Sequence, residues 1–401
     1  MRKRPLLIAV VLLIAALTVY AMENAREPEI EVPPPPKLVL PEPLELSSPI
    51  MSHSDRVIDI HENLSRATFT NCTLRIIGEE GISLSDCELV GSRLLIESSR
   101  NVALSRSRVR DYYVHEKAAI RIVDVDGLLM EGNEVVNNSI GMVVEGGSGV
   151  EIRLNLFEAN DQHNAILGLN CHGAEICNNV FRFNFPHALM IMNRGEDPEV
   201  RLDIHDNLFD RNLEDAINFE DFRGATEETR VYRNRVNGTG WAGVNVEYNS
   251  WGANIVIEEN YIDANGLMTE GLLDGGGRPL DVYPAHGHQP EPYSPGWGHG
   301  VKLEDCSGVT VRDNTIIANS GCGIEARNAR GILLEGNVVA SNLVGVSVMG
   351  YDEGALLREF SPLSREDAGA SQVMARGNSV FDNPEGDWDV EEGSEVLSEQ
   401  G

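Results

Sequence analysis

The segments Val150–Asn160 (VEIRLNLFEAN), Ala174–Asn184 (AEICNNVFRFN) and Leu202–Asn212 (LDIHDNLFDRN) decide the fold of this 401-residue chain. Each contains alternating apolar residues, an asparagine, a short and mostly apolar stretch, and a second asparagine. The first asparagine recurs in most steps after 22 to 28 residues, at Asn133, Asn155, Asn179, Asn207, Asn234, Asn260, Asn314, Asn337 and Asn378. A fixed period of this length is typical of a solenoid.

A second short segment follows most of these asparagines, as in Ile140–Glu145 (IGMVVE), His187–Asn193 (HALMIMN) and His299–Asp305 (HGVKLED). It alternates with period two, which indicates a strand with one buried face. Repeats with two or three such strands leave no room for helices, and they bury their apolar faces only by stacking. We therefore predict an all-β fold, a right-handed parallel β-helix of about ten to eleven coils.

The asparagine column is predicted to be architectural. Asparagine tolerates a left-handed backbone, and stacked side-chain amides can form hydrogen bonds between coils. Phe157, Phe181 and Phe209 follow the asparagines at inward positions and are expected to fill the core. Cys72 and Cys87 stand at matching places in successive short repeats, so they are candidates for a disulfide in an exported protein.

The asparagine repeats and the closing segment GNSVFDNPEGDWDV (Gly377–Val390) resemble the broad family of carbohydrate-binding and sugar-hydrolase β-helix domains of the pectate lyase-like superfamily. The family includes pectin-degrading enzymes, alginate epimerases and lyases, and a periplasmic protein that helps to mature nitrous-oxide reductase. The likeness covers roughly Asp55 to Val390. It implies the fold and a polysaccharide or glycan partner, while the reaction stays open because the motif is architectural.

The chain is strongly acidic, with 63 Asp and Glu against 32 Lys and Arg and a net charge of −31. This charge would repel nucleic acid, anionic membranes and a bare polyanionic sugar unless a cation bridges them. We expect no nucleic-acid partner, a membrane contact only through the N-terminal segment, and a monomer.

The domain organisation follows from composition. Residues 1–25 join basic side chains to an apolar run, which is typical of an export signal or a membrane anchor. Residues 26–54 are proline-rich and read as an extended linker. The β-helix is assigned to residues 55–390, with insertions at 265–298 and 351–370, and residues 391–401 form an acidic tail. We expect the β-helix to lie outside the cytoplasm, as a secreted, periplasmic or membrane-anchored protein.

Aligning the second strands separates one inward column from two outward columns. The inward column is Met142, Ile166, Leu189, Ile217, Val244, Val301, Ile324 and Val346. The outward columns are Val143, Leu167, Met190, Asn218, Asn245, Lys302, Glu325 and Ser347, and Glu145, Leu169, Met192, Glu220, Glu247, Glu304, Arg327 and Met349. Both outward columns change from largely apolar to polar and charged in the central coils, which predicts a functional face there.

Glu220, Glu247 and Glu304 should stack on neighbouring coils about 4.8 Å apart. Carboxylates this close raise one another's pKa or hold a cation, and calcium takes six to eight oxygen ligands. These three residues are therefore candidate Ca²⁺ ligands, with a solvated charged face as the alternative. The candidate substrate-binding residues are Asn218, Asn245, Glu325 and Trp297, the last within the 265–298 insertion, which is long enough to be a lid.

Three functions remain open. A uronate lyase or epimerase would need a base and a positive centre, for which Lys302 and Arg327 are the candidates. A glycoside hydrolase would use paired carboxylates; Glu214–Phe219 (EDAINF) and Gly298–Gly300 (GHG) are similar to two polygalacturonase signatures, which implies Asp215 and His299 as catalytic residues. A non-catalytic binding or structural protein, or a maturation factor, would need none of this chemistry.

Overall fold

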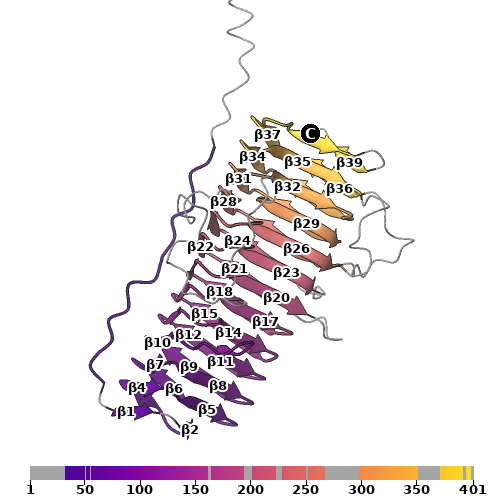
Figure 1. The fold of residues 1–401 in the computed structure, drawn as a ribbon. Helices are drawn as coiled ribbons and strands as arrows, with labels where there is room; N and C mark the ends of the chain where they lie inside the picture. The colour runs from indigo at the N-terminus through magenta and orange to yellow at the C-terminus, as the bar shows by residue number, and fades with distance from the viewer. Residues whose placement is uncertain are drawn as a thin grey trace, which may run out of the picture. The chain divides into compact units, whose positions relative to one another are not determined.

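The computed structural model describes residues 32–49, 51–54, 56–160, 164–193, 201–222, 228–249, 252–266, 298–350, 371–391 and 394–398. These residues form a parallel β-helix with three sheets, each of 13 strands in the described part of the chain (Figure 1). The predicted all-β solenoid of about ten to eleven coils is confirmed, and short strands at both ends lengthen each sheet. The described ranges contain no helix at all, hence none that could cross a membrane, and residues 1–25 lie outside these ranges.

Each coil gives one strand to each sheet. Sheet A comprises β1 (Met51–Ser54), β4 (Ala67–Thr70), β7 (Glu88–Val90), β10 (Arg108–Arg110), β13 (Glu134–Val136), β16 (Leu156–Glu158), β19 (Val180–Arg182), β22 (Leu208–Asp210), β25 (Arg235–Asn237), β28 (Tyr261–Asp263), β31 (Thr315–Ile317), β34 (Val338–Ala340) and β37 (Ser379–Phe381). Sheet B comprises β2 (Val57–Asp59), β5 (Thr73–Ile77), β8 (Arg93–Glu97), β11 (Ala118–Val123), β14 (Ile140–Glu145), β17 (Ile166–Leu169), β20 (Leu189–Asn193), β23 (Ile217–Phe222), β26 (Val244–Asn249), β29 (Val301–Cys306), β32 (Cys322–Arg327), β35 (Val344–Met349) and β38 (Trp388–Val390). Sheet C comprises β3 (Leu64–Ser65), β6 (Ser83–Ser85), β9 (Arg100–Ser105), β12 (Asp126–Glu131), β15 (Ser148–Arg153), β18 (His172–Cys177), β21 (Leu202–His205), β24 (Thr229–Tyr232), β27 (Ile255–Glu258), β30 (Val309–Arg312), β33 (Ile332–Glu335), β36 (Gln372–Arg376) and β39 (Glu395–Ser398).

The solenoid extends beyond residues 55–390 at both ends. Strand β1, inside the expected linker, pairs with β4, and β39, inside the expected acidic tail, pairs with β36. The insertion at 351–370 and most of the insertion at 265–298 lie outside the described residues.

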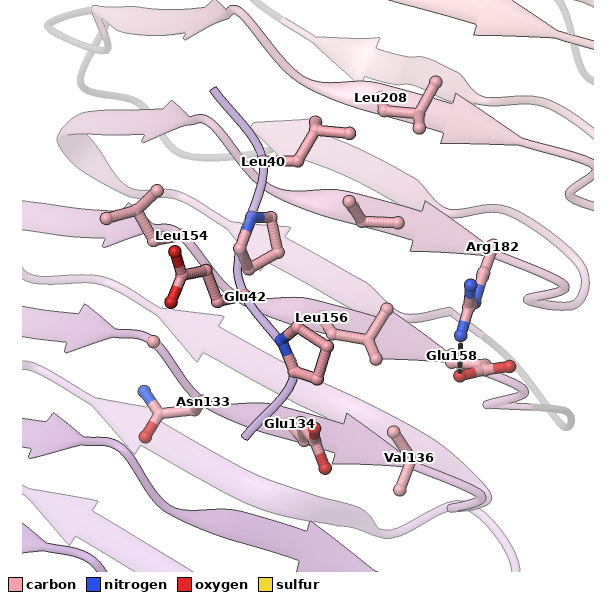
Figure 2. A pocket seen from close by; sticks show the side chains of 14 residues that line it. Leu40, Glu42, Asn133, Glu134, Val136, Leu154, Leu156, Glu158, Arg182 and Leu208 are labelled. Atoms are coloured by element: carbon pink, nitrogen blue, oxygen red, sulfur yellow. Dashed lines mark hydrogen bonds and ion pairs between the residues drawn. The ribbon is translucent and has the colours of Figure 1, made fainter. Parts of the chain in front are cut away.

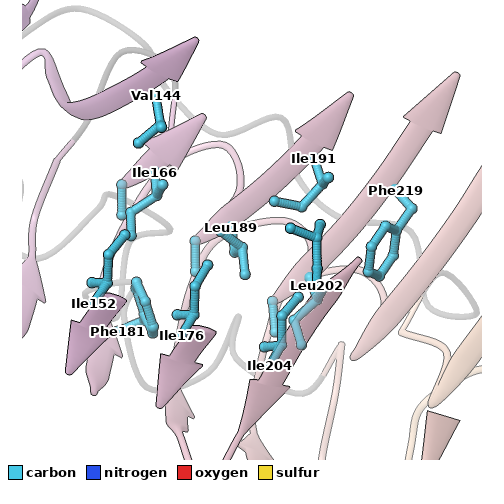
Figure 3. Close-up of a cluster of buried hydrophobic side chains, with 14 of the residues drawn as sticks. Val144, Ile152, Ile166, Ile176, Phe181, Leu189, Ile191, Leu202, Ile204 and Phe219 are labelled. Carbon is cyan, nitrogen blue, oxygen red and sulfur yellow. The ribbon is translucent and has the colours of Figure 1, made fainter. Parts of the chain in front are cut away.

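The core is a continuous apolar column inside the three sheets. The predicted inward column of sheet B is in register from Met142 to Val346. Phe157, Phe181 and Phe209 are fully buried and stack with centroids 5.0 and 4.9 Å apart, so their predicted core role is confirmed. Figure 3 shows how side chains of all three sheets meet in this core.

The nine asparagines of the predicted column form an unbroken ladder. In one rung, Asn207 donates its side-chain N–H to the carbonyl of Ile176 and to Asn234 Oδ1, while its own Oδ1 accepts from the backbone and side chain of Asn179. A second ladder follows sheet A, for instance from Asn160 to Asn184. Both ladders satisfy buried polar groups at the corners between sheets, as the structural prediction required.

The left-handed backbone falls on a different residue from the one expected. The residue before each asparagine of the first ladder has positive φ, such as Asp206 at 54° and Arg233 at 51°, whereas the ladder asparagines do not. The left-handed residue turns the corner, and the asparagine beyond it is free to point inward and bond its neighbours. The asparagines are therefore selected for their amides rather than for their backbone preference.

The six cysteines are free and buried, so the expected Cys72–Cys87 disulfide is wrong. The backbone N–H of Cys72 bonds Ser92 Oγ, and that of Cys87 bonds Ser107 Oγ. Ser107 continues into the first asparagine ladder at Asn133. The two cysteines thus occupy rungs at two different corners of the solenoid, which separates their sulfurs.

The proline-rich segment lies along the outer face of sheet A in its described part. Leu40 to Pro43 border a groove of about 480 Å³ with the side chains of β13, β16, β19 and β22, including Leu156 and Leu208 (Figure 2). The backbone N–H of Leu44 bonds Glu134 Oε1 at 3.0 Å, and its carbonyl accepts from Arg108. The segment has no helix or strand in residues 32–49, and it covers outward-facing apolar side chains of the sheet.

Candidate functional site

Four neighbouring strands of sheet B, β23, β26, β29 and β32, form the central part of the outer face. Their register places Asn218, Asn245, Lys302 and Glu325 in one line and Glu220, Glu247, Glu304 and Arg327 in the next, as predicted. A groove of about 590 Å³ lies over these strands. Its lining residues are Asp215, Trp241, Ala242, Asn245, Glu247, Tyr248, His299, Lys302, Glu304, Glu325 and Arg327.

The groove brings together most of the residues selected from the sequence. All four candidate catalytic residues, Asp215, His299, Lys302 and Arg327, line it. So do Asn245 and Glu325 of the substrate-binding set and Glu247 and Glu304 of the calcium set. Asn218 and Glu220 are next to the groove through strand pairing, while Trp297 lies outside the described residues.

Asp215 is an ionised, buried anchor at the start of β23. One of its oxygens accepts the backbone N–H of Ala242 at 2.9 Å, and the other accepts the amide of Asn245 at 3.2 Å and lies 3.3 Å from His187 Nδ1. Burial raises the pKa of Asp215, but the contact with His187, the Ala242 amide and the charge of Lys302 outweigh it and hold the pKa below its usual range.

Glu247 is shifted in the opposite direction. Burial is the main cause that raises its pKa, and the negative charges of Asp215 and Glu220 add to it. Lys302 and a 3.0 Å hydrogen bond from the Asn218 amide oppose this shift without reversing it. Two carboxyl groups of one groove therefore differ in proton affinity, Glu247 holding its proton to higher pH than Asp215.

Lys302 is a protonated cation within this cluster. Its Nζ forms an ion pair with Glu304, whose side chain is almost completely buried. Burial lowers the pKa of Lys302, but Glu304, Glu247 and Glu325 outweigh burial and raise it above its usual range. The ammonium therefore neutralises part of the carboxylate charge on this face.

His299 is neutral and held in one tautomer. Its Nδ1 accepts the backbone N–H of Cys322 at 3.2 Å, which leaves the proton on Nε2, 3.9 Å from Glu325 Oε2. Burial lowers the pKa of His299; Glu325 opposes this effect, whereas Lys302 and Arg327 add to it. In this state His299 can donate a hydrogen bond through Nε2 but cannot accept a proton through Nδ1 without losing its bond to the backbone.

Two buried amide oxygens in or beside the groove have no hydrogen-bond partner among the described residues. They are Asn218 Oδ1 and Asn245 Oδ1, and both residues are at most 3% exposed. Glu325 Oε1 also has no hydrogen bond, but the Arg327 guanidinium lies 3.4 Å from it. A buried acceptor without a partner costs roughly 1–3 kcal/mol. Such acceptors in a groove are typical of a site whose ligand supplies the donors.

His187 and Glu214 belong to the site and were not selected from the sequence. His187 Nε2 lies 3.7 Å from Glu214 Oε2, and burial raises the pKa of Glu214 to about 7, with Asp215 and Glu247 adding and His187 opposing. The signal that would have identified His187 is its position directly before the small residue Ala188, the same place that Asp215 and His299 occupy in their coils. The column formed by His187, Asp215 and His299 lies before the alternating part of each strand, so the alternation pattern did not include it.

The calcium hypothesis concerns Glu220, Glu247 and Glu304, which do align on neighbouring coils. Lys302 already supplies a cation to Glu304, and Glu247 accepts an amide. This donor set is a poor fit to an ion that needs six to eight oxygens. Calcium binding here stays a prediction.

Comparison with known proteins supports the fold. Residues 58–204 and 294–361, more than half of the chain, match the family model described as the right handed beta helix region. The crystal structure of the periplasmic alginate epimerase AlgG is similar with a TM-score of 0.53 and 16% identity, over 84% of this chain and 77% of that chain. The catalytic domain of a GH87 alpha-1,3-glucanase in complex with tetrasaccharides gives a TM-score of 0.53 and 12% identity, over 92% and 70% of the two chains. A search of curated proteins by sequence finds no match.

Proposed function

Because this chain belongs to the right-handed β-helix family, we propose that it is a glycan-processing enzyme that hydrolyses an uncharged polysaccharide in the groove on sheet B. The observation that carries the proposal is a groove of about 590 Å³ in which the carboxyl groups of Asp215 and Glu247 lie beside the rings of Trp241 and Tyr248. Within it the pKa of Glu247 is raised and that of Asp215 is lowered. Glycoside hydrolysis needs such a pair, one carboxylic acid and one carboxylate.

The lining of the groove suits a saccharide. Trp241 and Tyr248 offer apolar ring surface, and the side-chain oxygen of Asn245 is a buried acceptor without a hydrogen-bond partner among the described residues. Sugar hydroxyl groups are donors that can satisfy such acceptors, and binding sites commonly combine aromatic surface with a few oriented polar groups. The complex would relieve the cost of the unpaired oxygens, which favours binding of a polyhydroxylated ligand over an apolar one.

The charge of the groove favours an uncharged glycan over a uronate. Four of its lining residues are acids and two are permanent cations, and both cations are paired within it, Lys302 with Glu304 and Arg327 with Glu325 at 3.4 Å. A lyase or epimerase would need an unpaired positive centre and a base, whereas Lys302 keeps its proton. The same surface charge that repels nucleic acid would also repel a polyuronate.

The reaction follows from the protonation states. Glu247 gives its proton to the glycosidic oxygen while the bond from that oxygen to the anomeric carbon breaks. Asp215 takes a proton from the water that attacks the anomeric carbon, so one water is consumed and two saccharide ends are formed. Asn218 and Lys302 keep the pKa of Glu247 from rising further, and His187 keeps Asp215 ionised.

The N-terminal sequence supports a place outside the cytoplasm. Residues 1–25 combine a basic start with an apolar run, and a polysaccharide substrate would be met on the outer side of the membrane. We therefore include export in the proposal: the protein would be secreted, periplasmic or membrane-anchored.

The test is a panel of uncharged and uronic polysaccharides, with reducing ends and unsaturated uronates measured separately. We expect new reducing ends from at least one uncharged glycan and no unsaturated product. Glu247→Gln and Asp215→Asn should each lower kcat/KM about 10²–10⁴-fold. Glu145→Gln is the matched control, because Glu145 stands in the same outward column several coils away from the groove.

Three outcomes would change the assignment. Unsaturated uronates as products would establish a lyase in place of a hydrolase. Full activity of Glu247→Gln on a confirmed substrate would remove Glu247 as the acid. Binding of a glycan without turnover by any preparation would establish the alternative, a non-catalytic glycan-binding protein.

A further inference from the structure

Two groups of His, Cys and Glu side chains in the described residues are close enough to share a metal ion. One is Glu175, Cys177 and His205 on the outer face of sheet C, and the other is His299, Cys322 and Glu325 beside the groove on sheet B. Within each group the ligand atoms lie within 4.8 Å of one another. The two groups have the same three donor types, so hydrogen bonding of the histidine decides between them.

The group on sheet B is not prepared for a metal. His299 Nδ1 accepts the Cys322 N–H, so its lone pair is occupied and Nε2 carries the proton. Ligation through either nitrogen would therefore first have to break that bond or remove that proton. Lys302 and Arg327 also act on His299 as positive charges, which would repel a cation.

The group on sheet C has the opposite arrangement. His205 Nδ1 lies 2.7 Å from Asp206 Oδ2, so Nδ1–H can donate to that carboxylate. A metal ion could then take the place of the proton between Nε2 and Glu175 without breaking the bond at Nδ1. A carboxylate on the far nitrogen is the usual support of a metal-binding histidine. Nε2 points at Glu175, with 3.0 Å between the nitrogen and Oε1. Cys177 pairs with His205 in the strand register, on the neighbouring coil.

We propose that Glu175, Cys177 and His205 bind one zinc ion on the outer face of sheet C. A nitrogen and an oxygen 3.0 Å apart can both reach a single ion at Zn–N and Zn–O distances of about 2.0–2.2 Å. The mixed thiolate, imidazole and carboxylate donors suit zinc better than calcium or magnesium, which prefer oxygen alone. This site is independent of the groove on sheet B and of the proposed hydrolysis.

The charges around the site permit a cation. Arg153 is beside Cys177 in the register, but Glu151 and Glu131 hold its guanidinium at 2.5 and 3.2 Å. Asp203, paired in the register with Glu175, is neutralised by Arg201 at 3.2 Å, and Asp206 is shared with Arg233 at 2.6 Å, so Glu175 is the carboxylate that would face the ion. The ion would join β18 to β21 through side chains of two successive coils, and it would stabilise the contact between them.

The experiment uses the full-length protein without a polyhistidine tag, stripped of metal with a chelator. Co²⁺ is titrated as a spectroscopic probe, and Zn²⁺ is titrated by calorimetry. We expect one equivalent per chain, a thiolate-to-cobalt charge-transfer band, displacement of Co²⁺ by Zn²⁺, and a rise of Tm with Zn²⁺. Cys177→Ser and His205→Gln should abolish the band and weaken binding at least tenfold.

Cys322→Ser is the matched control, because it removes the cysteine of the group on sheet B. The band should persist in this variant, and its loss there but not in Cys177→Ser would move the metal to sheet B and overturn the proposal. The absence of a charge-transfer band in the wild type would also overturn the proposal. So would equal Co²⁺ affinity of the wild type and of Cys177→Ser. Circular dichroism of each variant shows whether a lost band reflects a lost ligand or a lost fold.

Discussion

The buried asparagines of the corner ladders and those of the groove have the same side chain in two different situations. In the ladder, Asn207 has both its amide nitrogen and its oxygen fully paired with backbone and side-chain neighbours. On sheet B, Asn245 in the groove and Asn218 beside it each donate to a carboxyl group, and their oxygens have no hydrogen-bond partner among the described residues. Burial alone therefore does not tell architecture from function; the completeness of hydrogen bonding does.

The difference has an energetic meaning. A complete network contributes to stability, whereas an incomplete one costs free energy until a ligand completes it. The ladders maintain the spacing of the coils, and the groove is placed where that spacing aligns polar side chains of successive strands.

The largest expected effect is on stability, from breaking a ladder in its middle. Asn207→Ala removes four hydrogen bonds: it takes the acceptor away from the Asn179 backbone N–H and side-chain amide, and it takes a donor away from the Ile176 carbonyl and from Asn234 Oδ1. Asn234 Oδ1 keeps only the Asn207 backbone N–H, and the Asn179 side-chain amide keeps only the Ile152 carbonyl. We expect a loss of roughly 3–5 kcal/mol in the free energy of unfolding. Chemical denaturation followed by circular dichroism measures it.

Asn245→Ala is the comparison that sharpens this prediction. It removes one hydrogen bond to Asp215 together with an oxygen that had no partner, so the loss of stability should be about 1 kcal/mol or less. Equal losses in the two variants would show that the distinction between ladder and groove asparagines is wrong.

A smaller effect concerns Glu214, whose pKa of about 7 in the folded state exceeds the ordinary value of 4.5. Between these two values the folded protein binds more protons than the unfolded chain, so this group makes stability fall as pH rises through that window. Glu214→Gln cannot ionise and should gain relative to the wild type by at most roughly 2–3 kcal/mol between pH 5 and pH 8. Thermal or chemical unfolding at several pH values measures this.

Glu62→Gln is the control for that pH series, because Glu62 is exposed and has no ion pair among the described residues. Its difference from the wild type should stay constant across the same pH range. A constant difference for Glu214→Gln as well would mean that Glu214 is not desolvated in the folded protein.

The smallest effect is a shift in the pH profile of activity. The charge of Lys302 lowers the pKa of Glu247, while burial, Asp215 and Glu220 raise it and Asn218 lowers it. Lys302→Met should therefore move the alkaline limb of kcat/KM to higher pH, since Glu247 must be protonated to act as the acid. If the alkaline limb stays in place or moves to lower pH, it does not report the ionisation of Glu247.

The alternation of the strands made the face of the site predictable. Both outward columns of sheet B, from Val143 to Ser347 and from Glu145 to Met349, have the predicted register, because a period of two and one small residue per coil fix the alignment. The groove could be predicted from the point at which these columns become polar.

The parts that could not be predicted depend on contacts between coils outside the alternating pattern. His187 and Glu214 precede their strands, so the alternation assigns them no face. The burial of Glu304 and Glu325 contradicts the idea of a solvated charged face, because an outward position on a strand does not determine exposure. Cys72 and Cys87 look equivalent in sequence, yet they lie at two different corners of the solenoid. Their backbone N–H groups bond different serines, Ser92 and Ser107.

The proline-rich segment along sheet A has a consequence for solubility. Val136, Leu156 and Leu208 point outward from β13, β16 and β22, and residues 40–43 line the same groove. A chain shortened to begin at Met51 would keep every strand but would present these apolar side chains to water in one stripe. Exposed stripes of this kind promote self-association. Residues 40–43 thus cover part of this apolar stripe on sheet A.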